Sequence, residues 1–146
     1  AKEITDASLE LLDKGYDFGR INFANGDMVG HSGRIDPAIV AIETVDESVG
    51  RLVERVLALK GTVVITADHG NSDEMFTEKN GVRTPKTSHT LNPVPFCILD
   101  AEGQAQWELA AVDAPGLANV AATLLNLLGF EKPEDYEPSL IRRRTV

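Results

Sequence analysis

Residues 61–70 read GTVVITADHG, and this stretch decides the fold. Every residue from 62 to 66 is β-branched, which is typical of a buried strand. The preceding residues 36–60 carry apolar side chains every three to four positions, which predicts a long helix that begins near Asp36 as its N-cap and ends at Gly61. A long helix that leads directly into a buried strand indicates an α/β fold.

A second strand is predicted on the amino-terminal side of the long helix. Residues 18–23 alternate between apolar and polar side chains, and the pattern breaks at residues 24–26. Strand, helix and strand in this order predict a βαβ unit with a right-handed parallel crossover, and therefore a mainly parallel sheet. Residues 1–14 form a further helical pattern that stops at Gly15.

The region after the central strand begins with a long polar segment. Residues 71–92 are too many for a simple connection, so we expect a functional loop or a small hairpin there. A third strand is predicted at residues 94–99, where the neighbouring prolines favour an edge or bulged position. A last helix is predicted from about residue 115 to residue 128. We expect the 146 residues to form a single globular unit.

The composition excludes several classes of protein. Fourteen basic and 23 acidic residues give a formal net charge of −9, so we expect no nucleic-acid partner. No apolar run approaches the roughly 20 residues needed to cross a bilayer, so we expect no membrane partner and a cytoplasmic, monomeric protein. The one cysteine, Cys97, lies in an apolar stretch and is expected to be a buried thiol. The acidic pair Asp73 and Glu74 is expected to form a solvated loop face.

Two Asp/His pairs follow predicted strands. Asp27 and His31 come after the first strand, and Asp68 and His69 come after the central strand. Because the carboxyl ends of parallel strands meet at one edge of a sheet, we expect the two pairs to lie close together.

The third histidine, His89, precedes its strand, and the amino end of a parallel strand would lie on the far side of the sheet. His89 can therefore join the two pairs only if residues 71–92 fold back or if the strand at 94–99 runs antiparallel. We expect one of these arrangements, because carboxylates and neutral imidazoles together suit manganese or zinc, and this number of them suggests more than one ion. The adjacent Asp68 and His69 can share an ion only if the strand has ended by Ala67; otherwise they serve different ions. Two such ions could hold a phosphate.

Three segments carry a resemblance to a known family. They are NFANGDMVGHSG at residues 22–33, TADHGN at residues 66–71 and HTLNPVPF at residues 89–96. In order and spacing they resemble the metal-binding segments of the cofactor-independent phosphoglycerate mutases, which belong to the alkaline-phosphatase-like superfamily. The similarity extends over about residues 16–129.

The resemblance implies a fold and a ligand set. It implies that residues 1–146 are the carboxyl-terminal fragment of a phosphatase-like metal-binding domain, part of an α/β/α sandwich with a mainly parallel sheet. It also implies that Asp27, His31 and His89 hold one ion. Asp68 and His69 would help to hold the other. Both ions would be Mn²⁺, with Zn²⁺, Co²⁺ and Mg²⁺ as alternatives.

The implied activity is a glycolytic isomerisation that moves phosphate between the 3- and 2-positions of glycerate through a phosphoserine intermediate. In the family the nucleophilic serine and the phosphoglycerate-binding domain lie in a segment absent from this chain, so we expect the chain alone to be inactive. Ser32 and Ser88 are interpreted as loop hydrogen-bonding residues. Gly26 replaces the proline usual in the family. The alternatives are a metal-dependent phosphatase or sulfatase of the same superfamily, or a non-catalytic metal-binding module.

Overall fold

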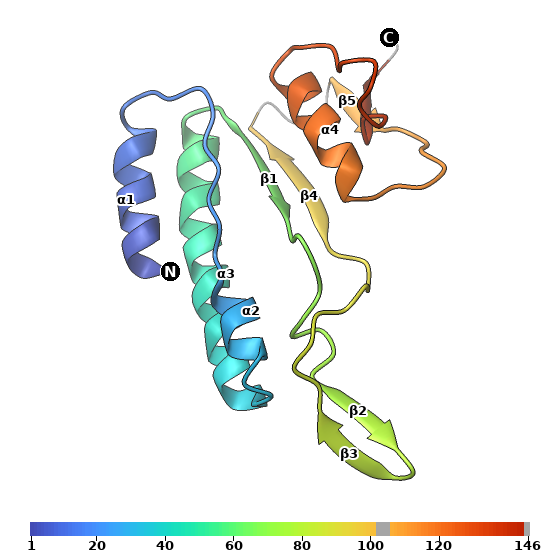
Figure 1. Ribbon diagram of the computed structural model, residues 1–146. Coiled ribbons are helices and arrows are strands. Elements are labelled where there is room, and N and C mark those ends of the chain that lie inside the picture. Colours follow the sequence, from blue (N-terminus) through green and yellow to red (C-terminus); the bar gives the residue numbers. More distant parts are fainter. Residues whose placement is uncertain (102–105, 145–146) are drawn as a thin grey trace. The chain divides into compact units, whose positions relative to one another are not determined.

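The computed structural model describes residues 1–101 and 106–144, and these fall into two compact units that divide after residue 98. The first unit contains three helices, a central strand and a hairpin, and the strand β4 begins in it (Figure 1). These elements are α1 (Lys2–Leu12), α2 (Asn25–Gly30), α3 (Ile35–Ala58), β1 (Thr62–Thr66), β2 (Phe76–Lys79), β3 (Val82–Pro85) and β4 (Phe96–Asp100).

The predicted long helix is confirmed as α3, and α1 packs along it. Arg51 of α3 donates a hydrogen bond to Asp6 of α1 at 2.7 Å, and Arg55 pairs with Asp13 just beyond the end of α1. The predicted N-cap is wrong, because α3 begins at Ile35 after Arg34. Asp36 instead lies in the first turn, where its negative charge interacts favourably with the amino end of the helix.

The strand predicted at residues 18–23 is not formed, and the βαβ unit with a parallel crossover is therefore wrong for the described chain. These residues are extended, but none of the described strands pairs with them. Phe18 and Ile21 are 55% and 41% exposed. Alternation makes a segment able to form a strand, whereas a ladder also needs a neighbouring strand to supply hydrogen bonds.

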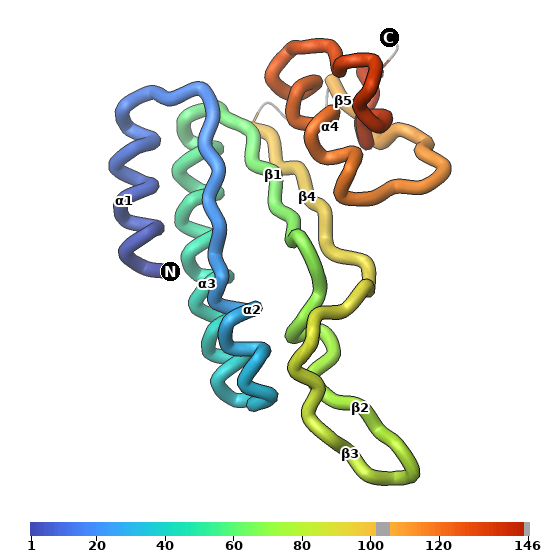
Figure 2. The backbone as a smooth tube through the Cα atoms, viewed as in Figure 1, coloured from blue at the N-terminus to red at the C-terminus, as the bar shows by residue number. Residues whose placement is uncertain are grey.

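Of the two structures expected within residues 71–92, the small hairpin is formed by β2 and β3, which pair antiparallel from Phe76↔Pro85 to Lys79↔Val82. Its turn contains Asn80 and Gly81, both with positive φ, as a tight two-residue hairpin turn requires. The hairpin returns the chain alongside itself, as Figure 2 shows, and an antiparallel bridge joins Gly70 to Thr90.

The central strand β1 is confirmed over the residues predicted, and it pairs with β4. Figure 1 shows β4 running in the direction opposite to β1, which is one of the two arrangements expected for His89. A mainly parallel sheet stays a prediction that the described strand pairs do not support. Cys97 of β4 is exposed, and the expected burial of its thiol is wrong.

The second unit contains the antiparallel pair of strands β5 (Trp107–Leu109) and β6 (Ile141–Arg143), and between them in the chain the short 3-10 helix η1 (Leu117–Asn119) and α4 (Val120–Leu127). The last predicted helix is confirmed by η1 and α4. Thr123 of α4 donates to the carbonyl of Asn119 at 2.8 Å and accepts from the N–H of Leu140 at 2.9 Å, which ties the helix to the segment before β6. Among the helices described, none has the length and apolarity to span a membrane.

Candidate metal centre

The short helix α2 presents the first two candidate ligands. Asp27 lies in its first turn and His31 is its C-cap residue, so the two side chains share one face of the helix. The carboxylate Oδ1 of Asp27 lies 3.2 Å from Nε2 of His31. A helix was not expected in this polar break, and it is the helical spacing of four residues that brings the pair together.

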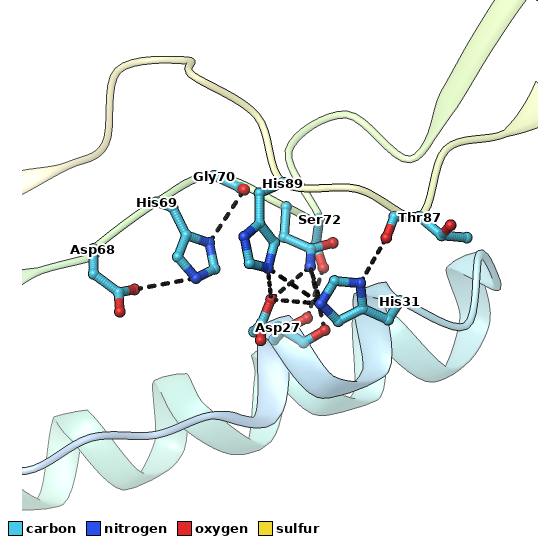
Figure 3. A network of polar contacts seen from close by, with 10 residues as sticks. Asp27, His31, Asp68, His69, Gly70, Ser72, Thr87 and His89 are labelled. Carbon is cyan, nitrogen blue, oxygen red and sulfur yellow. Dashed lines mark hydrogen bonds and ion pairs between the residues drawn. The ribbon is translucent and has the colours of Figure 1, made fainter.

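His89 joins this pair from a different segment. An antiparallel bridge pairs Gly70 with Thr90, the residue next to His89, and His89 itself reaches Asp27 of α2. Its Nε2 lies 3.0 Å from Oδ1 of Asp27 and 3.2 Å from Nε2 of His31 (Figure 3). The ligand atoms of the three residues all lie within 4.8 Å of one another, which confirms the predicted convergence of His89 with Asp27 and His31.

The hydrogen bonding of His31 indicates what this trio can bind. Its Nδ1 lies 2.6 Å from the carbonyl oxygen of Thr87, so in the neutral ring Nδ1 carries the proton and Nε2 carries the lone pair. That lone pair faces the carboxylate of Asp27 and the Nε2 of His89. Nε2 of His89 can donate a hydrogen bond to the carboxylate or to Nε2 of His31 in one tautomer, and in the other tautomer the three atoms form a set of lone pairs that fits a divalent cation.

Asp68 and His69 lie beside the trio. The strand β1 ends at Thr66, before both residues, so the condition for sharing one ion is met. The Oδ1 of Asp68 and the Nε2 of His69 are 3.7 Å apart, which ligand bonds of about 2.0–2.2 Å can span. The ring of His69 stacks on that of His89, with centroids 3.7 Å apart and planes at 17°. The side chain of Asp68 is 80% exposed and is not part of the trio.

The structure also adds residues that the sequence did not single out. The buried Asn71 donates from Nδ2 to Oδ1 of Asp27 at 2.7 Å and reaches the backbone oxygen of the same residue at 3.3 Å. Ser72 donates to the carbonyl of Gly26 at 2.9 Å. These contacts bind the segment after β1 onto α2. The only signal in the sequence was the position of Asn71 within the second metal-binding segment.

Asp73 is exposed and Glu74 is partly exposed, in line with the expected solvated face, but both side chains also make specific contacts. Asp73 accepts hydrogen bonds from Thr90 at 2.9 Å and from Asn92 at 2.6 Å, and Glu74 pairs with Lys86 at 2.7 Å. The hydrogen bond from Asn92 lowers the pKa of Asp73, with a smaller lowering by Thr90 and an opposing effect of burial. Asp73 therefore anchors the segment that carries His89.

The pKa of Asp27 is also lowered. The hydrogen bond from Asn71 is the largest cause, and the positive charge available to His31, His89 and His69 lowers the pKa further, while burial opposes the shift. Asp27 is therefore a carboxylate at neutral pH, which is the form that binds a cation.

The geometry and donor set agree with a family assignment. A model of the Metalloenzyme superfamily matches residues 1–132, so the chain belongs to the Metalloenzyme superfamily, whose alkaline-phosphatase-like fold is of the α/β class predicted.

Similar proteins include phosphoglycerate mutases. The chain is 48% identical to the 2,3-bisphosphoglycerate-independent phosphoglycerate mutase of Trypanosoma brucei brucei, over 97% of this chain and 28% of that protein. It is 47% identical to the same enzyme of Clostridium acetobutylicum, over 92% of this chain and 26% of that protein. A structure of Leishmania mexicana phosphoglycerate mutase at low cobalt concentration matches with 47% identity and a TM-score of 0.91, covering 98% of this chain and 28% of that chain. The chain thus spans about a quarter of the length of these relatives.

Proposed function

We propose that Asp27, His31 and His89 bind one divalent metal ion and that Asp68 and His69 contribute to a second. The observation that carries the first site is the convergence of three ligand atoms within 4.8 Å. The stack of His69 on His89 supports the second site, because it holds the other pair next to the first. Mn²⁺ is the proposed metal, with Zn²⁺, Co²⁺ and Mg²⁺ as alternatives.

The proposed role of this centre is that of a phosphoglycerate mutase. The whole protein would interconvert 3-phosphoglycerate and 2-phosphoglycerate through a phosphoserine intermediate. Bound ions would neutralise charge on the transferred phosphate. The residues of this chain would hold those ions: the carboxylates reduce the positive charge of the site, and the hydrogen bond from His31 to Thr87 holds one imidazole in the binding orientation.

This chain would supply only part of the active site. We propose that residues 1–146 are the carboxyl-terminal part of the phosphatase-like metal-binding domain and that the nucleophilic serine and the substrate-binding residues lie elsewhere in the whole protein. The identity to mutases that are about four times longer supports this. A monomeric state and a cytoplasmic location are parts of the same proposal.

The test is product analysis on the whole protein and on its variants. Asp27→Ala and His89→Ala should each lower turnover at least about 100-fold, because each removes a metal ligand. Asp46→Ala is the matched control, since it removes an exposed carboxylate from the middle of α3 and should leave turnover unchanged.

The products separate the alternatives. Transfer of phosphate to the neighbouring hydroxyl supports the mutase, whereas release of free phosphate alone would assign the same residues to a phosphatase. Unchanged turnover in both ligand variants would leave a non-catalytic metal-binding module. The metal-depleted protein is then reconstituted with Mn²⁺, Zn²⁺, Co²⁺ or Mg²⁺ in turn, and the turnover with each ion ranks the four metals.

A further inference from the structure

The carboxamide of Asn71 is a buried polar group in direct contact with the trio. Its Nδ2 lies 2.7 Å from Oδ1 of Asp27, the same oxygen that faces the Nε2 atoms of His31 and His89. The side chain is only 6% exposed, although Asn is usually a surface residue. A carboxylate oxygen has room for two partners, so Oδ1 can accept this N–H and still bind a cation.

The orientation of the Asn71 amide is determined by its surroundings. At the Nδ2 end the neighbours are acceptors, namely the carboxylate and the backbone oxygen of Asp27. A flipped amide would place Oδ1 against these oxygens and would be repelled. In the observed orientation Oδ1 is buried and has no hydrogen-bond partner within residues 1–101 and 106–144. An unsatisfied buried oxygen is unfavourable, which indicates that the contact of Nδ2 with Asp27 has a function.

Gly30 creates the space that this amide occupies. A Cβ atom on Gly30 would lie 2.3 Å from Oδ1 and 2.9 Å from Cγ of Asn71. Any other residue at position 30 would therefore push the carboxamide away from α2. The sequence thus provides both the amide and the space that lets it approach the metal-binding face of the helix.

We propose that Asn71 is a positioning residue of the metal centre: its buried amide holds Oδ1 of Asp27 toward the two imidazoles, so that this oxygen binds the ion. The proposal rests on the proposed function, because it assumes that the trio binds a metal. It goes beyond that function by assigning a role to a residue that is not itself a ligand. Hydrogen bonds of this kind orient ligands, and their loss typically weakens metal affinity about 10–100-fold.

The test is a Mn²⁺ titration of the metal-depleted whole protein, followed by the electron paramagnetic resonance signal of free Mn²⁺. Asn71→Ala should raise the Kd of the trio site about 10–100-fold. Asn126→Ala is the matched control, because it deletes the same amide from a hydrogen bond to the backbone of Phe130 and should leave the Kd unchanged. An Asn71→Ala protein with a Kd within about twofold of the parent would overturn the proposal.

A second variant and a second measurement separate positioning from folding. Gly30→Ala keeps the amide but displaces it, and it should raise the Kd in the same direction. For each variant the melting temperature is measured with and without Mn²⁺. If Asn71 positions the ligand, its variants should show a smaller increase in melting temperature on addition of Mn²⁺ than the parent does. If its role is purely structural, the melting temperatures with and without Mn²⁺ should fall equally, and that result would also overturn the proposal.

The two proposals fail in different ways. If Asp27→Ala abolishes the binding seen in the parent protein and Asn71→Ala does not weaken it, only the role of Asn71 is lost. If Asp27→Ala binds Mn²⁺ as tightly as the parent does, the metal assignment itself is wrong, and the role of Asn71 falls with it.

Discussion

The imidazole of His69 stacks on that of His89, with ring centroids 3.7 Å apart and planes 17° from parallel. His89 belongs to the trio with Asp27, whereas His69 belongs to the second pair of candidate ligands. The stack therefore places the two proposed ion sites side by side. Two positive ions in adjacent sites repel each other, which explains why carboxylates accompany the imidazoles in both.

This stack predicts different outcomes for two substitutions of His69. His69→Phe keeps an aromatic ring against His89 but removes the ligand nitrogen, so the whole protein should lose the second ion and keep the first. His69→Ala should also weaken the first site, by about 2–10-fold, because an aromatic pair contributes about 0.5–1.5 kcal/mol. Metal content by elemental analysis and Mn²⁺ titration check both results. Two ions bound by His69→Phe would contradict the assignment of His69.

A second prediction concerns Asp73 and pH. The folded-state pKa of Asp73 lies below its ordinary value of 3.8, so its hydrogen bonds stabilise the fold above that pH. The stability is lost as the pH falls through the lowered pKa, when the carboxylate takes up a proton. Chemical unfolding from pH 2.5 to pH 7 should therefore show that the parent has a higher free energy of unfolding than Asp73→Asn, by an amount that is constant near neutrality. This difference in free energy should shrink below about pH 3.8. A difference independent of pH would show that the charge of Asp73 is not involved.

A third prediction contrasts two glycines of α2. At Gly26 an added Cβ would meet only Cδ1 of Ile42, at 2.9 Å, and this flexible end of a half-exposed side chain can move. Gly26→Ala should raise the free energy of unfolding by up to about 1 kcal/mol, because alanine favours the helix and restricts the unfolded chain.

Gly30→Ala makes the same substitution in the same helix but should have the opposite effect, since its Cβ would overlap the buried Asn71. This change should lower the free energy of unfolding by about 1–3 kcal/mol. Urea unfolding of the metal-free chain measures both changes. Equal effects of the two substitutions would mean that the space beside Gly30 is not needed for packing.

A fourth prediction concerns the chain by itself. It should bind Mn²⁺ weakly or only in part, because ligands contributed by the rest of the protein would be absent and water would complete the coordination. Isothermal titration calorimetry of the 146-residue chain tests this. Two tight sites in this measurement would show that the chain alone holds a complete centre.

Much of the local structure was predictable. The β-branched run at residues 62–66 and the apolar periodicity before it depend on neighbours close in sequence, and β1 and α3 formed where expected. The length of residues 71–92 predicted a functional loop or a small hairpin, and the hairpin formed, with Asn80 and Gly81 at its turn. The candidate ligands were found because all three histidines, two of them with an aspartate nearby, lie in polar breaks between predicted elements.

Long-range pairing was not predictable in the same way. Residues 18–23 alternate like a strand, but whether they form one depends on a neighbour that the alternation does not specify. Two predictions were wrong for related reasons, namely that Asp36 is the N-cap of the long helix and that the thiol of Cys97 is buried. Both features depend on which other segments pack against these residues.

By itself, the sequence determined which residues could bind metal, and it placed the strand β1 and the long helix before it, since composition and short-range periodicity control these. Only the tertiary structure decided that His89 lies against Asp27 and that Asn71 donates a hydrogen bond to the same carboxylate. Those contacts join segments more than forty positions apart, and the contact of His89 exists because the chain turns back at the β2–β3 hairpin. Such contacts depend on the packing of whole elements, which no local pattern of residues encodes.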